Sequence, residues 1–393
     1  MVDATYDVVI IGGAAMGSSI ACHLAADPAF SGRILVLEKD PSYQRCASAL
    51  SAASIRQQYS SPINVEISLY GIAFLREIGA RLEVDGERPE IGLHEGGYLF
   101  LATPETAAGM RAANAMQRGL GADIALLEPD ALSARFPWLN TEGLALGSYG
   151  LSGEGWFDGY GLMQAFRRKA RALDVTYAAA EADGLEMTNG RITGVRLADG
   201  RTVSCGLVVN AAGIGGPDIA RAAGLDLPVH PRKRMIFTFT CADQVEHCPL
   251  LIDPTGVYVR PEGAGFLCGT APPPEADPDC TDFEVDHTLF EDLIWPTLAA
   301  RVPAFERIRP GRAWAGHYDL NLFDQNAILG PAPQVPNLYL CNGFSGHGLQ
   351  QAPAVGRGMA EHIVHGRYLS LDLSPLGAAR ISAGQPMREA KVV

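Results

Sequence analysis

The start of the chain carries a hydrophobic pattern typical of a βαβ unit. Residues 5–11 (TYDVVII) form an apolar, β-branched run, which the glycine-rich residues 12–17 (GGAAMG) interrupt. Residues 14–26 are rich in small side chains and predict a helix, and residues 33–38 (RILVLE) predict a second buried strand. Because parallel strands need such a crossover, this order of elements predicts an α/β fold.

A second helix is predicted after two serines. Ser60 and Ser61 precede Pro62, which is typical of a hydroxyl N-cap followed by proline in the first helical turn. Apolar side chains then recur at helical spacing and predict one buried face. These side chains are Ile67, Tyr70, Phe74, Leu75 and Ile78.

The middle of the chain differs in kind. Residues 97–102, 234–240 and 256–260 are short strand-like runs separated by proline- and glycine-rich turns. They predict an antiparallel or mixed sheet that contacts the substrate. Residues 191–213 predict a hairpin with Asp-Gly at its turn, ending in the buried run LVVNAAG.

The end of the chain returns to the pattern of its start. Residues 337–341 (NLYLC) predict a buried strand that leads into the loop GFSGHG, and residues 352–365 predict a helix. We therefore expect a dinucleotide-binding domain built from three separated pieces, with a substrate domain inserted between them. The expected pieces are 1–85, 145–225 and 326–393 for the first domain, and 86–144 and 226–325 for the second.

Composition excludes several classes of protein. The chain has 393 residues, of which 47% are hydrophobic and 19% charged, so it can bury a large core. Its net charge of −13 disfavours nucleic-acid binding. We found no apolar run long enough to span a membrane and no basic leader. The eight cysteines form no CxxC pair, so we expect no disulfide framework, no metal site and a cytoplasmic location.

The glycine turn lies between a predicted strand and a predicted helix, which is the position of the glycine turn in dinucleotide-binding folds. Gly12 permits the tight turn, and Gly17 permits close packing of helix on strand. Ala14 replaces the middle glycine of the usual motif. Glu38 ends the second strand, where a carboxylate accepts hydrogen bonds from a ribose diol and repels a 2′-phosphate. NADP is therefore disfavoured.

The turn alone does not distinguish FAD from NAD. Two later segments favour FAD, namely residues 207–213 and residues 337–356, because an NAD domain needs no such distant contributions. The helix after GFSGHG would direct its N-terminus at the flavin pyrimidine ring, and its dipole would stabilise negative charge on the reduced flavin.

Three long segments resemble the D-amino-acid-oxidase-like superfamily of FAD oxidoreductases, which includes sarcosine, glycine and dimethylglycine oxidising enzymes. Within it, the chain is most similar to the FAD-dependent oxidoreductase domain-containing proteins. The resemblance implies a glutathione-reductase-like Rossmann FAD-binding domain and a mixed or antiparallel-sheet substrate domain, with the substrate between them. The segments are residues 54–75 (SIRQQYSSPINVEISLYGIAFL), 314–331 (WAGHYDLNLFDQNAILGP) and 342–375 (NGFSGHGLQQAPAVGRGMAEHIVHGRYLSLDLSP).

The resemblance also implies catalytic residues. Arg56 matches the arginine that binds the substrate carboxylate, and a guanidinium suits that role because it offers a bidentate fork. Tyr258 matches an active-site tyrosine, although a strand-face aromatic is an equal alternative. His347, flanked by glycines, is expected to contact the flavin or line the substrate cavity. Arg260 and His317 are weaker candidates for the cavity.

FAD contacts are implied along the chain, mostly in the glycine turn, the second strand and the GFSGHG loop. They are Gly12, Gly13, Ala14, Ala15, Met16, Gly17, Glu38, Lys39, Ser48, Ser51, Ala52, Ala182, Ala212, Gly213, Gly316, Gly343, Gly346, His347, Gly348, Leu349 and Gln350.

The chain departs from sarcosine oxidases at three positions. Gln350 replaces a carboxylate-binding lysine, which weakens the case for a sarcosine-like substrate. Leu267 replaces the lysine that speeds reaction with oxygen, and none of the four lysines of the chain lies nearby. Gly316 replaces the cysteine that tethers flavin, so we expect non-covalent FAD.

The leading hypothesis is an FAD-dependent amine or amino-acid oxidase or dehydrogenase. It would oxidise the C–N bond of an amino acid or N-substituted amino acid by hydride transfer to flavin N5, and water would hydrolyse the imine. Oxygen, a quinone or an electron-transfer protein would accept the electrons. The alternative is a flavoprotein that acts as an assembly or interaction factor, because mitochondrial relatives assist assembly of respiratory complex I. A nicotinamide enzyme is a third hypothesis.

Overall fold

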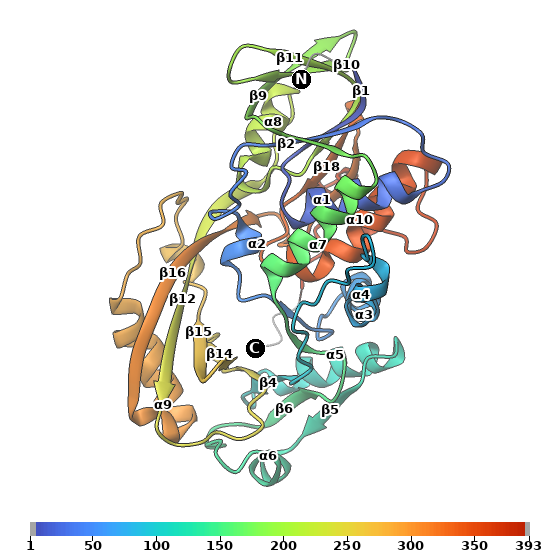
Figure 1. Ribbon diagram of the computed structural model, residues 1–393. Coiled ribbons are helices and arrows are strands. Elements are labelled where there is room, and N and C mark those ends of the chain that lie inside the picture. Colours follow the sequence, from blue (N-terminus) through green and yellow to red (C-terminus); the bar gives the residue numbers. More distant parts are fainter. Residues whose placement is uncertain (1–4, 390–393) are drawn as a thin grey trace.

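The computed structural model describes residues 5–389 and contains two large sheets (Figure 1). The first sheet lies at the top of the view with its helices, and the long strands β12 and β16 of the second sheet run down one side. The second sheet continues to the bottom through β4, β6 and β5. Between residues 5 and 389, no helix is long and apolar enough to cross a membrane.

The first sheet has a parallel centre. Strand β1 pairs in parallel with β2 and β11, β2 with β8, and β11 with β18. β17 closes one edge antiparallel to β18, and the hairpin β9–β10 extends antiparallel from β11. The strands are β1 (Tyr6–Ile11), β2 (Ile34–Glu38), β8 (Thr176–Ala179), β9 (Ala182–Thr188), β10 (Arg191–Leu197), β11 (Thr202–Asn210), β17 (Ile328–Ala332) and β18 (Val335–Asn342).

Side chains of the central strands alternate between two cores, as period-two geometry requires. Val8 and Ile10 of β1 belong to the core under the helices α1, α3, α7 and α10, whereas Val9 and Ile11 face the core under the hairpin and α8. Helix α1 packs closely on α10, where the Ser19 hydroxyl donates to the Ala352 carbonyl at 2.7 Å. The helices are α1 (Ala15–Ala26), α3 (Pro62–Arg76), α7 (Gly159–Ala172), α8 (Gly216–Ala222) and α10 (Gly348–His365).

The second sheet is mixed. All neighbouring strands are antiparallel except the parallel pair β4 and β13. Together the two sheets confirm the predicted α/β class with a mixed second sheet. In spatial order the strands are β16 (Ile308–Asn321), β12 (Val229–Cys241), β15 (Gly265–Gly269), β14 (Tyr258–Glu262), β13 (Leu250–Ile252), β4 (Tyr98–Ala102), β6 (Leu146–Gly150) and β5 (Ile124–Leu127).

Alternation along the second sheet separates a core from a cavity wall. Leu99 of β4 packs in a core with helices α6 and α9, whereas its neighbours Tyr98 and Phe100 line a cavity. The remaining α-helices and β-strands are short, apart from α5. They are α2 (Ala47–Leu50), β3 (Ser54–Ile55), α4 (Ile78–Arg81), α5 (Ala107–Gly119), α6 (Pro129–Arg135), β7 (Gly155–Trp156), α9 (Trp295–Arg301) and α11 (Ala379–Ser382).

Some predicted boundaries differ from the structure. Strand β6 pairs in the second sheet, so that sheet extends past the expected domain boundary at residue 145. Helix α10 begins at Gly348, four residues earlier than predicted, directly after a loop whose Ser345 and Gly346 have φ of 53° and 91°. These left-handed residues end the loop and allow the helix to start at once.

The predicted hydroxyl cap of α3 is wrong. Ser61 is the N-cap residue of this helix, but its side chain makes no capping hydrogen bond to the helix backbone. The hydroxyl instead donates to the carboxylate of Glu389. A polar partner more distant in the sequence therefore competes with the local cap.

Candidate active site

One cavity of about 340 Å³ lies between the two sheets. The first sheet and its loops supply one wall, and strands β4, β12, β13, β14 and β16 supply the other. Most of the sequence-predicted site residues line it. They are Ala14, Ala15, Met16, Ser48, Ser51, Ala52, Arg56, Gly213, Tyr258, Gly316, His317, Gly346, His347, Gly348, Leu349 and Gln350.

The turn before α1 has the close contacts expected of a phosphate-binding loop. Gly12 has φ of +99°, and a Cβ there would lie 2.3 Å from the Ala211 carbonyl oxygen. A Cβ on Gly17 would lie 1.9 Å from the Gly12 carbonyl oxygen. The N-cap residue, Ala14, has no capping side chain, the Ala15 N–H donates to Ser48 Oγ at 3.3 Å, and the first residues of α1 line the cavity. The positive end of the helix dipole therefore lies at the cavity, where it would attract an anion.

Glu38 lies beside this turn, at the end of β2. Its carboxylate accepts hydrogen bonds from the backbone N–H groups of Gly13 and Asp40, both at 2.9 Å. The Ala180 N–H donates to the Glu38 carbonyl at 3.0 Å, which brings the segment before Ala182 to the same edge of the sheet. Five predicted FAD contacts lie outside the cavity wall but next to or within these segments. They are Gly12, Gly13, Gly17, Glu38 and Ala182, whereas the neighbouring Lys39 is exposed.

The loop before α10 is held by Asp319, which sequence reasoning missed although it lies in the segment WAGHYDLN. Its carboxylate accepts from the Gly343 N–H at 2.8 Å, and its carbonyl accepts from the Ser345 N–H at 3.1 Å. Burial raises the pKa of Asp319 to about 6. A Cβ on Gly346 would lie 2.4 Å from the Tyr318 ring, so only glycine fits there. The uncapped N-terminus of α10 follows at the cavity wall. Of the other predicted contacts, Gly343 and Ala212 lie just outside that wall.

A row of cross-strand neighbours forms the opposite wall. The register pairs Phe100 with Ile252, Ile252 with Tyr258, Tyr258 with Gly269, and Gly269 with Ile236. Because directly paired residues share a face, this row is continuous over five strands. A Cβ on Gly269 would lie 2.6 Å from the Tyr258 hydroxyl, so the missing side chain makes room for the tyrosine ring.

Arg56 is fixed at the junction of the two walls. Its guanidinium lies 4.0 Å above the Tyr59 ring centroid and 5.4 Å from that of Phe100. It donates to the Gln58 carbonyl, and Nη2 lies 3.2 Å from His347 Nε2. The Arg56 backbone N–H donates to Gln350 Oε1 at 2.8 Å. Within residues 5–389, no carboxylate forms an ion pair with this guanidinium.

His347 is neutral in this arrangement. Burial and the charge of Arg56 lower the pKa of His347 to about 3. Since arginine only donates, Nε2 of His347 is the acceptor, and the ring proton lies on Nδ1. The ring also meets Tyr59 edge-on, at 5.2 Å between centroids. The structure thus brings Arg56 and His347 into contact and places Tyr258 on the wall of the same cavity.

The two weaker candidates have other partners. The Arg260 guanidinium donates to the carbonyls of Ala52 and Pro261, at 2.7 and 2.8 Å, and pairs with Glu262. It therefore fastens the second sheet to the segment around residue 52. His317 lines the cavity, but its Nε2 lies 2.8 Å from the Asp282 carbonyl oxygen.

A second arginine on the cavity wall is already neutralised. Arg234 makes two hydrogen bonds of 2.8 Å to the carboxylate of Asp277, in the bidentate geometry typical of strong pairs. Sequence reasoning missed this pair because the two residues lie on different elements. Of the two arginines on the cavity wall, Arg56 is thus the one whose positive charge has no carboxylate partner between residues 5 and 389.

A buried acid, Glu154, lies behind Arg56 and was also missed. Its side chain accepts from the Gln57 N–H at 2.5 Å and from Gln58 Nε2 at 2.8 Å, and the residue is 0% exposed. Burial raises the pKa of Glu154 from 4.5 to about 7. Folding therefore favours the neutral acid, and this contribution to stability is lost as pH rises through about 7.

We expect Glu154→Gln to match the parent protein in stability near pH 5 and to exceed it near pH 8. Glutamine keeps the shape of the neutral acid, and after the Gln58 amide turns its oxygen inward the new NH2 group can donate to Gln58 Oε1, which has no partner in residues 5–389. Thermal unfolding of both proteins at the two pH values measures the effect. Equal destabilisation of the variant at both values would contradict it.

Comparison with known proteins identifies the family to which the chain belongs. Residues 7–362 match the family described as FAD dependent oxidoreductase, DAO. The chain belongs to this family. It is 42% identical to FAD-dependent oxidoreductase domain-containing protein 1 of Xenopus laevis, over 98% of the chain and 85% of that protein. It is 26% identical to the mitochondrial dimethylglycine dehydrogenase of Rattus norvegicus, over 92% of the chain and 43% of that protein.

Solved structures share the fold of this DAO-family chain. L-proline dehydrogenase from P. horikoshii superposes with a TM-score of 0.85 at 23% identity, covering 97% of this chain and 99% of the other. Glycine oxidase from Geobacillus kaustophilus gives 0.80 at 23% identity, covering 95% and 98%. The expected superfamily, the FAD cofactor and the class of FAD-dependent oxidoreductase are thereby confirmed.

The residues around the cavity fit FAD. The start of α1 would hold the pyrophosphate, Glu38 would bind the ribose diol, and the N-terminus of α10 would contact the flavin ring. The closest contacts at Gly12 and Gly17 leave no space for side chains in the turn, as this role requires. When bound, FAD supplies a two-electron acceptor for the reaction.

We expect Glu38→Ala to lower the affinity for FAD by about tenfold or more, since charge-assisted hydrogen bonds contribute about 1.5–3 kcal/mol. Titration of apoprotein with FAD, followed by flavin fluorescence, measures the change. Glu38→Gln keeps one acceptor oxygen and should fall between the two proteins. A Glu38→Ala protein that purifies with a full complement of FAD would refute the ribose assignment.

Proposed function

We propose that this enzyme oxidises the C–N bond of an amino acid or N-substituted amino acid. Bound FAD would supply the acceptor for a hydride from the carbon next to nitrogen, and water would hydrolyse the resulting imine to a carbonyl compound and an amine or ammonia. The observation that carries this proposal is the guanidinium of Arg56 at the cavity wall, which is fixed by Tyr59 and His347 and has no carboxylate partner within residues 5–389. An anionic group of the substrate would supply its missing partner.

The named relatives support the same substrate class. Dimethylglycine dehydrogenase, sarcosine dehydrogenase, L-proline dehydrogenase and glycine oxidase are each named for an amino acid or N-methylated amino acid. Each of these compounds carries a carboxylate next to the carbon that bears nitrogen. A single arginine fork therefore suits the carboxylate that all these substrates share. The opposite wall of the cavity would distinguish substrates by their other substituents.

The wall near Arg56 favours an apolar substituent. Tyr98, Phe100, Leu250 and Ile252 come from the paired strands β4 and β13 and line the cavity with aromatic and aliphatic side chains. Burying an apolar side chain here is favourable, whereas a charged one would lose its hydration without a partner. We therefore propose substrates with an apolar group on the α-carbon or on nitrogen.

Neutral groups surround the reacting amine in this proposal. His347 carries no proton on Nε2, and burial holds the pKa of Tyr258 well above its ordinary value. Neither residue adds charge to the site at neutral pH. Arg56 would orient the substrate through its carboxylate, and the apolar wall would exclude water from the carbon that loses hydride.

We propose that FAD is bound non-covalently. Gly316 offers no side chain for a flavin tether at the cavity wall. Leu267, on the cavity side of β15, pairs with Arg260 and is 2% exposed, so no ammonium group stands there to promote reaction with oxygen. Oxygen, a soluble quinone and an artificial electron-transfer dye should be compared as acceptors during turnover.

Anaerobic reduction tests the reaction itself. Purified holoprotein is mixed with N-methyl, cyclic and primary amino acids, and bleaching of the visible flavin band is followed. We expect at least one apolar amino acid or N-substituted amino acid to bleach the band, while its amide does not. Bleaching by a hydroxy acid and by no amine would overturn the amine assignment. A protein reduced by dithionite but by no substrate would favour an assembly role instead.

A further inference from the structure

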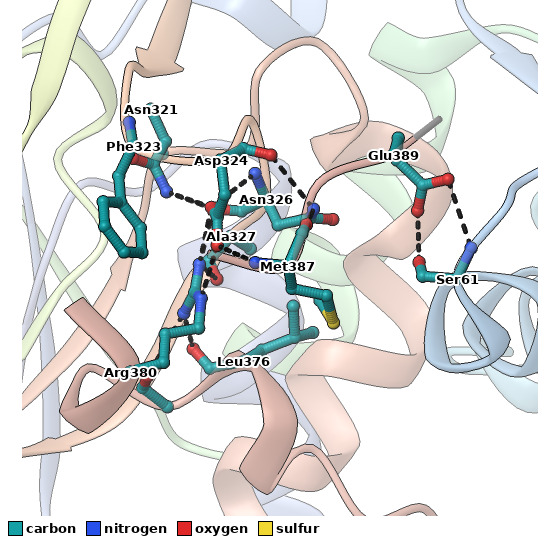
Figure 2. A network of polar contacts seen from close by, with 12 residues as sticks. Ser61, Asn321, Phe323, Asp324, Asn326, Ala327, Leu376, Arg380, Met387 and Glu389 are labelled. Atoms are coloured by element: carbon teal, nitrogen blue, oxygen red, sulfur yellow. Dashed lines mark hydrogen bonds and ion pairs between the residues drawn. The ribbon is translucent and has the colours of Figure 1, made fainter. Parts of the chain in front are cut away.

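The last described segment of the chain is anchored in the protein interior. Arg380 and Asp324 form a buried pair, with Nε 2.8 Å from Oδ2 and Nη2 3.0 Å from Oδ1 (Figure 2). The Met387 N–H donates to the same carboxylate at 3.1 Å, and the Met387 carbonyl accepts from Asn326. These contacts hold residues 380–387 against the loop that follows β16.

Beyond this anchor, Glu389 reaches the start of helix α3. Its carboxylate accepts from Ser60 N and Oγ at 2.5 and 2.6 Å, from Ser61 N at 3.2 Å and from Asn64 Nδ2 at 2.7 Å. The Ser61 hydroxyl also donates to it, as Figure 2 shows. A carboxylate at a helix N-terminus is stabilised by the helix dipole as well. Glu389 thus accepts hydrogen bonds from backbone N–H groups at the start of α3, a role that the side chain of the N-cap residue Ser61 does not fill.

The segment that Glu389 holds leads directly to the substrate arginine. Tyr59 precedes Ser60, is buried, and stacks under the Arg56 guanidinium at 4.0 Å. The Tyr59 hydroxyl accepts from the Gln350 amide, whose oxygen accepts from the Arg56 N–H. Arg56, Tyr59 and Ser60 are therefore linked by contacts that leave the guanidinium little freedom.

The negative charge of Glu389 also acts on the site. Burial and the charge of Arg56 lower the pKa of His347, and the charge of Glu389 opposes this lowering, so the carboxylate lies within electrostatic reach of the histidine that contacts Arg56. At this position the carboxylate fixes the segment and does not pair with Arg56. The arginine stays available to an incoming anion.

We infer that Glu389 is a positioning residue for Arg56. By fixing Ser60 and Ser61 it holds Tyr59 under the guanidinium, and this keeps the fork directed at a substrate carboxylate. Because this role rests on the proposed function, it predicts a loss that is selective for ligands with a carboxylate.

The experiment uses holoprotein and two matched ligands, pyrrole-2-carboxylate and pyrrole-2-carboxamide, whose binding is read from the flavin spectrum. The variants are Glu389→Ala and Glu389→Gln, with Arg388→Ala as the control because Arg388 is exposed and adjacent. We expect Glu389→Ala to weaken carboxylate binding about tenfold and carboxamide binding less than twofold. Glu389→Gln should lie between, and Arg388→Ala should match the parent protein.

The outcomes separate positioning from mere support of the fold. Equal weakening of both ligands, or unchanged carboxylate binding together with a lower unfolding temperature, would overturn the inference. If Glu389→Ala does not fold, the selectivity of Glu389→Gln decides in the same way. A parent protein that binds neither ligand, and whose flavin no amino acid reduces, would overturn the proposed function and the inference with it.

Discussion

The Arg56→Ala variant should bind a carboxylate substrate about 30- to 800-fold more weakly than the parent protein. This corresponds to about 2–4 kcal/mol, the magnitude of a buried charge-assisted pair that loses one partner. In the absence of substrate the guanidinium is held by Tyr59, His347 and the Gln58 carbonyl, and by no acidic group between residues 5 and 389. Removing it leaves the substrate carboxylate buried without a partner.

Steady-state kinetics with the substrate found in the anaerobic panel measures this effect as kcat/KM. Arg56→Lys keeps the charge but lacks the bidentate fork, so it should recover only part of the loss. Arg312→Ala, which removes an exposed arginine of β16, is the matched control and should leave kcat and KM unchanged. Unchanged KM and kcat in Arg56→Ala would remove Arg56 from the site.

The Gly17→Ala variant should lose most of its bound FAD and unfold at a lower temperature. The added Cβ would lie 1.9 Å from the Gly12 carbonyl oxygen and 3.2 Å from Ile10 Cγ2. Helix α1 must therefore move away from β1, which opens the turn that would hold the pyrophosphate. Overpacking of this kind costs about 1–3 kcal/mol.

The flavin-to-protein absorbance ratio and the unfolding temperature of apoprotein measure the two consequences separately. Gly109→Ala is the control, because this exposed helical glycine has nothing within 4 Å of its Cβ position and should gain about 0.5–1 kcal/mol. A Gly17→Ala protein with full FAD content and unchanged stability would show that the helix does not need this close contact.

Local patterns predicted the first sheet well because its signals lie within short stretches of sequence. The βαβ unit at 5–38 and the hairpin at 191–213 each combine hydrophobic periodicity with a glycine turn, and both are present. The cavity wall was harder to predict from the sequence. Phe100 and Ile252 are neighbours only through the parallel pairing of β4 and β13, which no local pattern encodes.

The same distinction separates the predicted from the missed site residues. Arg56 and His347 lie in long motifs, and a family resemblance was sufficient to single them out. Glu154 and Gly269 act through shape and burial, and neither residue type is unusual at its place in the sequence. Ser61 shows the opposite error, since a plausible local cap is displaced by Glu389 from 328 residues away.

The order of strands in the first sheet has a consequence for biosynthesis. β1 must wait for β11, and β11 for β18, so the central sheet cannot close until about residue 342 has left the ribosome. Until then the edge of β11 that pairs with β18 stays open, and such long-range pairing folds slowly and exposes the chain to aggregation. Chaperone dependence during translation, and a higher soluble yield when synthesis is slowed by cooling, are therefore to be expected of this topology.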